Sequence, residues 1–528
     1  MSEFELNAQI KIALDLLENT DKHVFITGRA GTGKSTLLTH FLTQITHQDF
    51  VVLAPTGVAA LNVGGETIHH FLRIKPAATT EEVIKDAKRA KKGKLAKLYQ
   101  HLDTIIIDEI SMVRADLFDH LDIFLQTVRK NKYPFGGVRI VCFGDLYQLP
   151  PVVQWSEREI FSQYYQSPYF FSSHVFKRLQ EEENLSNFAF IELEKIYRQS
   201  DPTFIDFLNQ VRDRTIDDHN LALINQKILQ TDNLDDIDSN YIILTVTKAK
   251  AQAINLARLN NLSGKKYSFT ADYYGNFNQS SAPNDEKLIL KKGARVMMLN
   301  NDSGGEWVNG SMGEISDIDY KNETIWVKLD HGNEIEVKKH SWEASSSVFD
   351  PVKQTITRQT IGSFTQFPIK LAWAITIHKA QGRTFDKLII DLEKNAFAAG
   401  QTYVAFSRGT SLNNIYLIRP LKKSDIRLDY QIVSFLTSLQ YQLAAINNQS
   451  DSFQALIEKA INEKCDLSMV YLKGKNIKSE RIITPLKISK MEFKGIEFLG
   501  LCAFCHQRQA ERNFALKRII NLKLINHQ

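Results

Sequence analysis

The chain has 528 residues, of which 43% are hydrophobic, 24% charged and 10% aromatic. This balance is typical of folded globular proteins and excludes a wholly disordered chain, a collagen and a disulfide-stapled miniprotein. At roughly 100–200 residues per domain, the length predicts about three to four domains. The formal net charge of +5 is unevenly placed: residues 458–528 hold 14 Lys and Arg against 7 Asp and Glu, which leaves −2 for the first 457 residues. A basic C-terminal segment after a nearly neutral chain indicates a polyanionic partner.

Cysteine content and hydropathy predict the compartment. The four cysteines are too few for a disulfide framework, which fits a reducing environment. The first residues lack the basic start and apolar core of a signal peptide, and no apolar run approaches the roughly 20 residues that span a bilayer. We therefore expect a cytoplasmic protein with no membrane partner.

Residues 24–40 read VFITGRAGTGKSTLLTH, an apolar β-prone run, a Gly-rich loop and an apolar helical pattern. The loop matches G-x-x-x-x-G-K-[ST] at every position. Backbone N–H groups of such a loop wrap a phosphate, and the helix N-terminus adds a favourable dipole. We expect Lys34 to reach the β- and γ-phosphates of a nucleotide and the Ser35 hydroxyl to bind Mg²⁺. The expected nucleotide-binding residues here are Gly28, Gly31, Thr32, Gly33, Lys34, Ser35 and Thr36.

Residues 104–112 read TIIIDEISM and supply a second motif. The three isoleucines predict a buried parallel strand, which delivers Asp108 and Glu109 at its carboxyl end. Asp108 suits coordination of Mg²⁺ through water, and Glu109 suits polarisation of the attacking water, because hydrolysis needs a positioned nucleophile. The two motifs together predict an ATP-type NTPase.

Further motifs follow in fixed order from about Leu6 to Leu421. They are LNAQ (6–9), APTGVAA (54–60), ETIHHF (66–71), GDLYQLPPV (144–152), LEKIYRQ (193–199), AWAITIHKAQG (372–382) and GQTYVAFSRG (400–409). In this order they resemble the Pif family of DNA helicases, within superfamily 1B and related to RecD. The resemblance implies an ATP- and Mg²⁺-dependent DNA helicase that moves 5′→3′ on single-stranded DNA and unwinds duplex.

The resemblance also implies nucleotide contacts beyond the phosphate loop. Gln9 would bind the adenine, and Gln148 would sense the γ-phosphate through a neutral amide. Arg198 and Arg408 match the positions of arginine fingers, whose planar guanidinium groups stabilise the transition-state charge. The residues expected to border the nucleotide from the second core are Gln381 and Gly382.

DNA contacts are implied by the other motifs. Thr56, Gly57 and Thr67 offer small polar groups and a close backbone approach to phosphates, and His69 and Phe71 could stack on bases. Helix capping for Thr56 and core packing for Phe71 are the structural alternatives. In the second core, the residues expected to touch DNA are Thr376 and His378. His70 stands where the family often has Ser, so it is given no role.

The expected fold class is α/β, with two RecA-like parallel-sheet cores and smaller modules. The expected ranges are 1–72 with 98–194 for the first, ATP-binding core, 73–97 for an inserted wedge, 195–262 with 362–432 for the second core, and 263–361 for an inserted small β-barrel. Residues 433–455 are expected as a linker. The stretch 85–97 has seven basic residues and one acidic residue, which fits either a DNA-splitting wedge or a solvated helix face.

Residues 456–528 resemble a WYL domain, a small β-rich module found mostly in bacteria and associated with ligand or nucleic-acid sensing. Arg481, Arg508 and Arg512 would bind phosphates of single-stranded DNA, unless they are solvated charges on strand faces. Cys502 and Cys505 form C-x-x-C, but a zinc site needs about four ligands and no second pair lies nearby, so core packing is the preferred interpretation.

The expected partners are single-stranded DNA and its junctions with duplex, bound by a monomer at a bacterial nucleoid. G-quadruplexes and RNA–DNA hybrids stay open as further targets. Two rival functions stay open as well. One is a single-strand translocase or protein-displacing ATPase that does not unwind duplex. The other is a ligand-sensing regulator that uses ATP as a switch.

Overall fold

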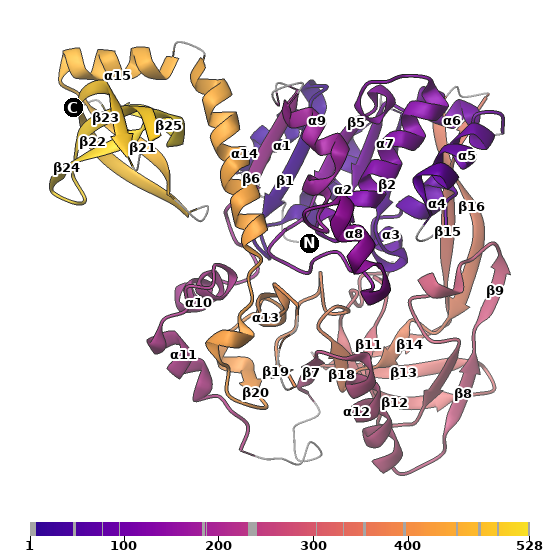
Figure 1. Ribbon diagram of the computed structural model, residues 1–528. Coiled ribbons are helices and arrows are strands. Elements are labelled where there is room, and N and C mark those ends of the chain that lie inside the picture. The colour runs from indigo at the N-terminus through magenta and orange to yellow at the C-terminus, as the bar shows by residue number, and fades with distance from the viewer. Residues whose placement is uncertain are drawn as a thin grey trace. The chain divides into compact units, whose positions relative to one another are not determined.

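The computed structural model describes every residue except 1–6, 46–48, 76–77, 94, 182–184, 186, 231–239, 303, 331, 352–354, 394–395, 397, 450–451, 474–476, 494–495 and 526–528. Leu6, the first residue of the LNAQ motif, therefore lies outside the described residues. The chain divides into two units (Figure 1), one of Met1–Val175 with Ile191–Leu428 and one of Phe176–Phe190 with Asp429–Gln528. Among the described helices, none is long and apolar enough to cross a membrane.

A six-stranded sheet forms the first core, in the order β3-β2-β4-β5-β1-β6. Its strands are β1 (His23–Gly28), β2 (Phe50–Ala54), β3 (Glu66–Thr67), β4 (Thr104–Ile107), β5 (Arg139–Phe143) and β6 (Phe188–Leu193). The pairings of β1 with β5, β5 with β4, β4 with β2 and β2 with β3 are parallel. Every residue of β1, β4 and β5 is buried, as expected of a parallel sheet covered on both faces.

Helices flank this sheet (Figure 1). They are α1 (Ala8–Asn19), α2 (Lys34–Gln44), α3 (Gly57–Asn62), α4 (Ile68–Leu72), α5 (Thr80–Ala90), α6 (Ala96–His101), α7 (Ala115–Arg129) and α8 (Arg158–Tyr164), whereas most of α9 (His174–Glu181) belongs to the second unit. The segment expected as a wedge contains α5, which begins with a capping box of Thr79 and Glu82. Its buried Val83 and Ala87 face α7, so Lys85, Lys88 and Arg89 of the basic run lie on the exposed side of a packed helix.

The second core is a smaller parallel sheet in the order β18-β7-β19-β20. Its strands are β7 (Ile242–Thr245), β18 (Ala374–Thr376), β19 (Leu388–Asp391) and β20 (Ile415–Leu417). Its helices are α10 (Pro202–Arg212), α11 (Asp218–Asn225), α12 (Lys248–Asn261) and α13 (Gln401–Phe406). The two parallel sheets confirm the α/β class predicted from the sequence.

Antiparallel strands fill the insertion in the second core. They are β8 (Tyr267–Thr270), β9 (Asp272–Gly275), β10 (Lys287–Leu290), β11 (Arg295–Met298), β12 (Met312–Asp319), β13 (Thr324–Leu329), β14 (Glu334–Val337), β15 (His340–Asp350), β16 (Thr355–Gln366) and β17 (Ile369–Leu371). The expected boundary at residue 361 is wrong, because β16 continues past it and β17 pairs with β11. One apolar cluster contains Ile243 and Ile389 of the core sheet and Val296 and Val327 of the insertion, so a shared core holds both together.

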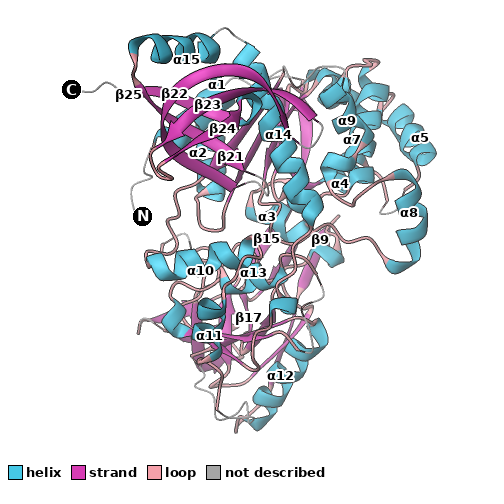
Figure 2. Ribbon diagram, turned by 60° about the vertical axis from the view of Figure 1, so that its left-hand side comes forward, coloured by secondary structure: helices cyan, strands magenta, loops and turns pink. Residues whose placement is uncertain are grey.

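The second unit is an antiparallel sheet preceded by two helices. Its elements are α14 (Tyr430–Gln449), α15 (Ser452–Glu463), β21 (Asp466–Lys473), β22 (Ile477–Phe493), β23 (Ile496–Cys505), β24 (Ala510–Ala515) and β25 (Ile519–Ile525). The strand order is β24-β23-β22-β21-β25, and the sheet is strongly curved (Figure 2). The segment predicted as a linker is mostly helix α14, because Ile432, Leu436 and Leu439 are buried at helical spacing.

Candidate functional site

The phosphate loop connects β1 to α2, from Gly28 to Lys34. Gly31 and Gly33 have φ angles of 82° and 84°, in the left-handed region that glycine adopts without strain. A Cβ atom on Gly31 would lie 2.6 Å from the Cβ of Arg198, so a side chain here has no room. The loop therefore has the close-packed, N–H-rich shape that holds a phosphate group at a helix N-terminus.

Lys34 is the charged group of this loop, and its ammonium donates to the carbonyls of Gly28 at 2.7 Å and Arg29 at 3.0 Å. Burial lowers the pKa of Lys34, and charged side chains nearby modify the effect. The side chains that act on it are Asp145, Glu109, Arg198 and Arg212. The structure thus brings one lysine, two carboxylates and two arginines around the phosphate loop.

The carboxylate pair follows β4, as the sequence predicts. The Glu109 backbone has a φ of 51° and its N–H donates to Oδ1 of Asp108 at 2.9 Å. Gln381 of the second core donates its Nε2 to Oε2 of Glu109 at 3.0 Å. Burial, together with the Asp108 charge, raises the pKa of Glu109 to about 7, and burial also raises the pKa of Asp108. A carboxyl group that titrates near neutral pH suits a proton acceptor.

Both predicted arginine fingers converge on Ser407. The Arg198 Nη1 donates to the carbonyl of Ser407 at 3.0 Å, and the Arg408 Nη2 donates to the Ser407 hydroxyl at 2.8 Å. Arg408 is only 1% exposed, and its remaining donors bond to the carbonyls of Val404, Ala380 and Arg383. Burial, reinforced by Arg198, lowers the pKa of Arg408 to about 9.

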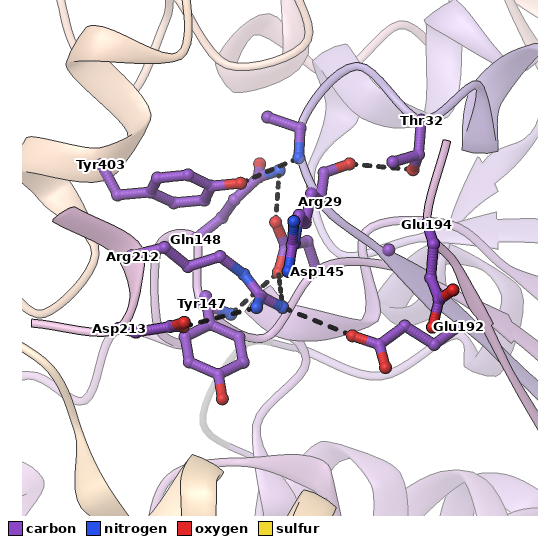
Figure 3. A network of polar contacts seen from close by, with 12 residues as sticks. Arg29, Thr32, Asp145, Tyr147, Gln148, Glu192, Glu194, Arg212, Asp213 and Tyr403 are labelled. Carbon is purple, nitrogen blue, oxygen red and sulfur yellow. Dashed lines mark hydrogen bonds and ion pairs between the residues drawn. The ribbon is translucent and has the colours of Figure 1, made fainter. Parts of the chain in front are cut away.

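The predicted γ-phosphate sensor, Gln148, belongs to a buried polar network (Figure 3). Its Nε2 donates to Oδ2 of Asp145 at 3.2 Å. The other Asp145 oxygen lies 4.0 Å from a guanidinium nitrogen of Arg212, the last residue of α10. Arg212 also lies 3.9 Å from a Glu192 oxygen and 3.5 Å from an Asp213 oxygen. The Arg212 side chain therefore connects the second core to the loop that holds Asp145 and Gln148.

Two tyrosines complete this network. The guanidinium of Arg212 stacks 3.7 Å from the ring centre of Tyr147, a cation–π contact. Burial alone would lower the pKa of Arg212. Interactions with Asp145 and the two tyrosines outweigh this effect, so the pKa of Arg212 is raised. The Tyr403 hydroxyl accepts from the Ala30 N–H of the phosphate loop at 2.9 Å. Helix α13 thus contacts the loop directly.

Sequence reasoning missed three of these side chains, Asp145, Arg212 and Tyr403. Asp145 and Tyr403 lie inside the GDLYQLPPV and GQTYVAFSRG motifs, so the motifs were a usable signal. Arg212 lies in no motif, and only tertiary structure brings the end of α10 to the phosphate loop.

The other predicted nucleotide-binding residues surround the same loop. The Oε1 of Gln9, on α1, accepts from the Glu194 N–H at 3.0 Å. Thr32 is buried and its hydroxyl donates to the carbonyl of Arg29 at 2.9 Å. The remaining three lie at exposed positions of α2 and of the loop after β18: Ser35, Thr36 and Gly382.

The first-core DNA residues line a cavity of about 490 Å³. Its walls include Thr56, Gly57, Thr67 and His69. Thr56 and Thr67 also cap helices α3 and α4, so the structural alternative for Thr56 holds. Ser281 of the insertion packs over this cavity, because a Cβ on Gly57 would lie 2.3 Å from its Cβ.

Two neighbours of this cavity differ from the expectation. Phe71 is 2% exposed and meets Tyr99 edge to face with ring centres 5.3 Å apart, so its predicted stacking on bases is wrong. His70, given no role, places its Nδ1 2.6 Å from an oxygen of Glu66. Arg73 lies 2.6 Å from the other nitrogen of His70 and donates to the Ser346 hydroxyl of β15 at 2.7 Å. These contacts fasten the insertion to the first core.

The second-core residues Thr376 and His378 lie at the carboxyl end of β18. Thr376 is 9% exposed and its hydroxyl accepts from the Lys379 N–H at 3.3 Å. Burial lowers the pKa of His378. Thr376 ends β18 and His378 lies in the loop that follows, which also holds Gln381, so the predicted DNA contacts lie close in sequence to the Glu109 contact.

In the C-terminal module, Arg481 donates to the Sγ of Cys505 at 3.3 Å, whereas Arg508 and Arg512 are exposed. Cys505 is buried and Cys502 half-buried, and an i, i+3 spacing on β23 points them to opposite faces. Within the described part of the chain, no group of three or more His, Cys, Asp or Glu could hold a metal. Core packing of Cys505 agrees with the sequence interpretation.

Two parallel sheets, a phosphate loop and a carboxylate pair after β4 define a P-loop NTPase with two RecA-like cores. A family model described as "PIF1-like helicase" matches residues 6–222, and one described as "WYL domain" matches residues 453–524. The ATP-dependent DNA helicase Pif1 of Bdellovibrio bacteriovorus is 32% identical over 426 residues, which cover 79% of this chain and 88% of that protein. The chain belongs to the PIF1-like helicase family and carries a C-terminal WYL domain.

Solved structures agree with this assignment. Pif1 from Bacteroides sp in complex with ADP-AlF4 has a TM-score of 0.72 and 36% identity, over 82% of this chain and 96% of that one. The structure of Bacteroides Pif1 bound to ssDNA has a TM-score of 0.57 and 35% identity, over the same shares of the two chains.

Proposed function

We propose that the chain is an ATP- and Mg²⁺-dependent DNA helicase that moves 5′→3′ on single-stranded DNA and unwinds duplex. The observation that carries the proposal is the hydrogen bond from Gln381 to Glu109. It connects the carboxylate suited to activating water, on the first core, with the second-core loop that holds Thr376 and His378. A movement of Glu109 when the nucleotide binds or is hydrolysed can therefore be transmitted through Gln381 to the nearby proposed DNA contacts.

The nucleotide site fits ATP because the loop offers N–H groups, a buried lysine and nearby carboxylates. Bound ATP supplies the γ-phosphoryl group, and Mg²⁺ neutralises its charge. Ser35 and Asp108 would hold the metal ion. Glu109 orients the attacking water and accepts its proton, which a pKa of about 7 favours. Lys34 leaves its two carbonyl acceptors for phosphate oxygens.

Movement arises at the boundary of the two cores, in this proposal. Tyr403 of the second core accepts a hydrogen bond from the loop N–H of Ala30, which a phosphate would compete for. Arg198 and Arg408 are held by neutral carbonyl and hydroxyl oxygens, weaker partners for a guanidinium than a phosphate. In this proposal, nucleotide binding replaces these protein–protein hydrogen bonds with contacts to the phosphates. Hydrolysis and product release restore the protein–protein hydrogen bonds.

Single-stranded DNA would lie against the first-core cavity and the loop after β18. In this arrangement the two parallel sheets, each with its flanking helices, act as the two motor domains. The insertion would sit over the strand, since Ser281 already packs on Gly57. Exposed Arg508 and Arg512 of the C-terminal module would add phosphate contacts.

Strand displacement tests the proposal. Duplexes carrying a 5′ tail, a 3′ tail or no tail are incubated with the full chain, ATP and Mg²⁺. Unwinding of the 5′-tailed duplex alone is expected. Unwinding confined to the 3′-tailed duplex contradicts the polarity. DNA-stimulated hydrolysis without any unwinding favours the rival translocase.

A further inference from the structure

Three basic side chains meet where the insertion joins the second core: Lys370, Lys379 and Arg383, here called the basic triad. Lys370 lies on β17, directly opposite Met297 of β11. The Arg383 Nη1 donates to the Met297 sulfur at 2.9 Å. Lys370 and Arg383 therefore flank the same methionine, and the charge of Lys379, in the segment that leads to Arg383, acts on the Lys370 ammonium.

Lys370 and Arg383 are half-buried and Lys379 is exposed, and the basic triad lacks the anionic partners that partly buried cations normally have. In the portion of the chain that the structure describes, none of its members forms an ion pair with a carboxylate. The charge of Asp285 acts on Lys370 and raises its pKa, against the lowering by burial and by the other two cations. The thioether that Arg383 contacts is a weak acceptor.

The electrostatics agree with this geometry. Burial lowers the pKa of Lys370 to about 7, with further lowering by Lys379 and Arg383 and opposition only from Asp285. Burial lowers the pKa of Arg383 to about 10. Holding three cations together destabilises the fold, and an anion bound among them would reverse that effect. Uncompensated charge clusters of this kind are characteristic of binding sites.

The position of the basic triad indicates which anion it binds. Lys379 directly follows His378, and its N–H bonds to the Thr376 hydroxyl, so it shares the loop of the two proposed DNA contacts. The phosphate loop has its own lysine, Lys34, on the other core. A phosphate at the basic triad would thus belong to a strand that passes Thr376 and His378, not to the nucleotide.

We propose that Lys370, Lys379 and Arg383 form a binding site for one backbone phosphate of single-stranded nucleic acid. This inference rests on the proposed function, because it deepens the same nucleic-acid path. It adds a contact from β17, a strand of the insertion's sheet. The insertion would then bind the strand directly as well as cover it.

Salt dependence of binding is the first test. The full chain and its Lys370→Met and Lys379→Met variants are titrated with a labelled oligothymidylate at several chloride concentrations, without phosphate buffer. Loss of this one phosphate contact makes the negative slope of log K against log salt less steep, by up to about 0.7 for a single strand. Lys338→Met is the matched control, because Lys338 is 70% exposed on the same insertion and pairs with Glu336. Its slope should equal that of the unaltered chain.

Proton linkage is the second test and is specific to Lys370. A phosphate favours the charged lysine, so the unaltered chain takes up close to one proton on binding at pH 8, and its affinity falls as pH rises from 7 to 9. Calorimetry in two buffers of different ionisation enthalpy measures this uptake. Lys370→Met should abolish it. Over this window the histidines near the path, whose pKa values are lowered, stay neutral.

The outcomes separate this inference from the proposed function. Oligothymidylate binding with no proton uptake, and an unchanged slope in Lys370→Met, overturns the basic triad while leaving the helicase proposal intact. Proton uptake with inorganic phosphate alone, and none with the oligonucleotide, also overturns it. Failure of the unaltered chain to bind oligothymidylate overturns both. The melting temperature of Lys370→Met should equal or exceed that of the unaltered chain. A lower melting temperature together with an unchanged salt slope would show that Lys370 stabilises the fold and does not bind the phosphate.

Discussion

The titration of Glu109 gives the sharpest test of the hydrolysis chemistry. Because burial and Asp108 raise its pKa to about 7, its carboxyl is protonated for part of the range in which the enzyme would work. Only the ionised form accepts a proton from water. The value of kcat/KM for ATP reports ionisations of the free enzyme, so it should follow the ionised fraction of Glu109.

The expected size of the effect follows from that pKa. The ionised fraction is about 9% at pH 6 and about 91% at pH 8, so kcat/KM should rise about tenfold over this range. Asp108→Asn removes a charge that raises the pKa and should move the rise to lower pH. Glu109→Gln should lower kcat about 100- to 10,000-fold and leave residual activity with no rise over this range.

A steady-state ATPase assay at saturating Mg²⁺ and constant ionic strength measures these profiles. It is run without DNA, so that histidines near the DNA path do not contribute. Glu306→Gln, at an exposed position of the insertion, is the matched control and should keep the profile of the unaltered chain. A flat profile between pH 6 and 8 in an active enzyme would refute the reasoning, and so would near-normal turnover by Glu109→Gln.

Three further predictions concern the second core and the C-terminal module. Arg408→Ala should lower kcat about 1,000-fold or more while the affinity for a fluorescent ATP analogue changes little, and unchanged turnover would contradict its finger role. Arg212→Met removes the ion-pair partner of the buried Asp145 and should lower the free energy of unfolding by up to about 3–5 kcal/mol in a denaturant titration. Arg212→Lys should lose less, and equal stability of both variants with the unaltered chain would show that the network is incidental. Deleting residues 456–528 should weaken DNA affinity and its salt dependence more than kcat, and an unchanged salt slope would show that the charge asymmetry is unrelated to DNA.

The sequence predicted most of what local pattern determines. The strands beneath the phosphate loop and the carboxylate pair were predictable because parallel core strands read as continuous apolar runs. The motifs predicted nucleotide-site roles for Lys34, Glu109, Gln148 and Arg408, and the structure brings these side chains around one loop, while their roles stay predictions. Local pattern also predicted the packing of Cys505, whose C-x-x-C lacked a second ligand pair.

What the sequence did not predict depends on contacts between distant segments. Arg212 ends an ordinary amphipathic helix, and its role appears only when α10 meets the Asp145 loop. The local sequence around Phe71 is the same whether the ring stacks on a base or packs in the core. Only its contact with Tyr99 shows that it packs in the core. The polar segment expected as a linker contains apolar residues at helical spacing, which the Gln and Asn content concealed. The basic triad unites residues on β17 and beyond β18 that no motif connects.

Polarity-resolved strand displacement is the most direct test of the helicase assignment. The full chain and Glu109→Gln are compared on duplexes with a 5′ or a 3′ single-stranded tail, each with and without ATP. We expect ATP-dependent unwinding of the 5′-tailed duplex by the unaltered chain and none by Glu109→Gln. Equal unwinding by both proteins, or unwinding only from the 3′ tail, would contradict the proposed function.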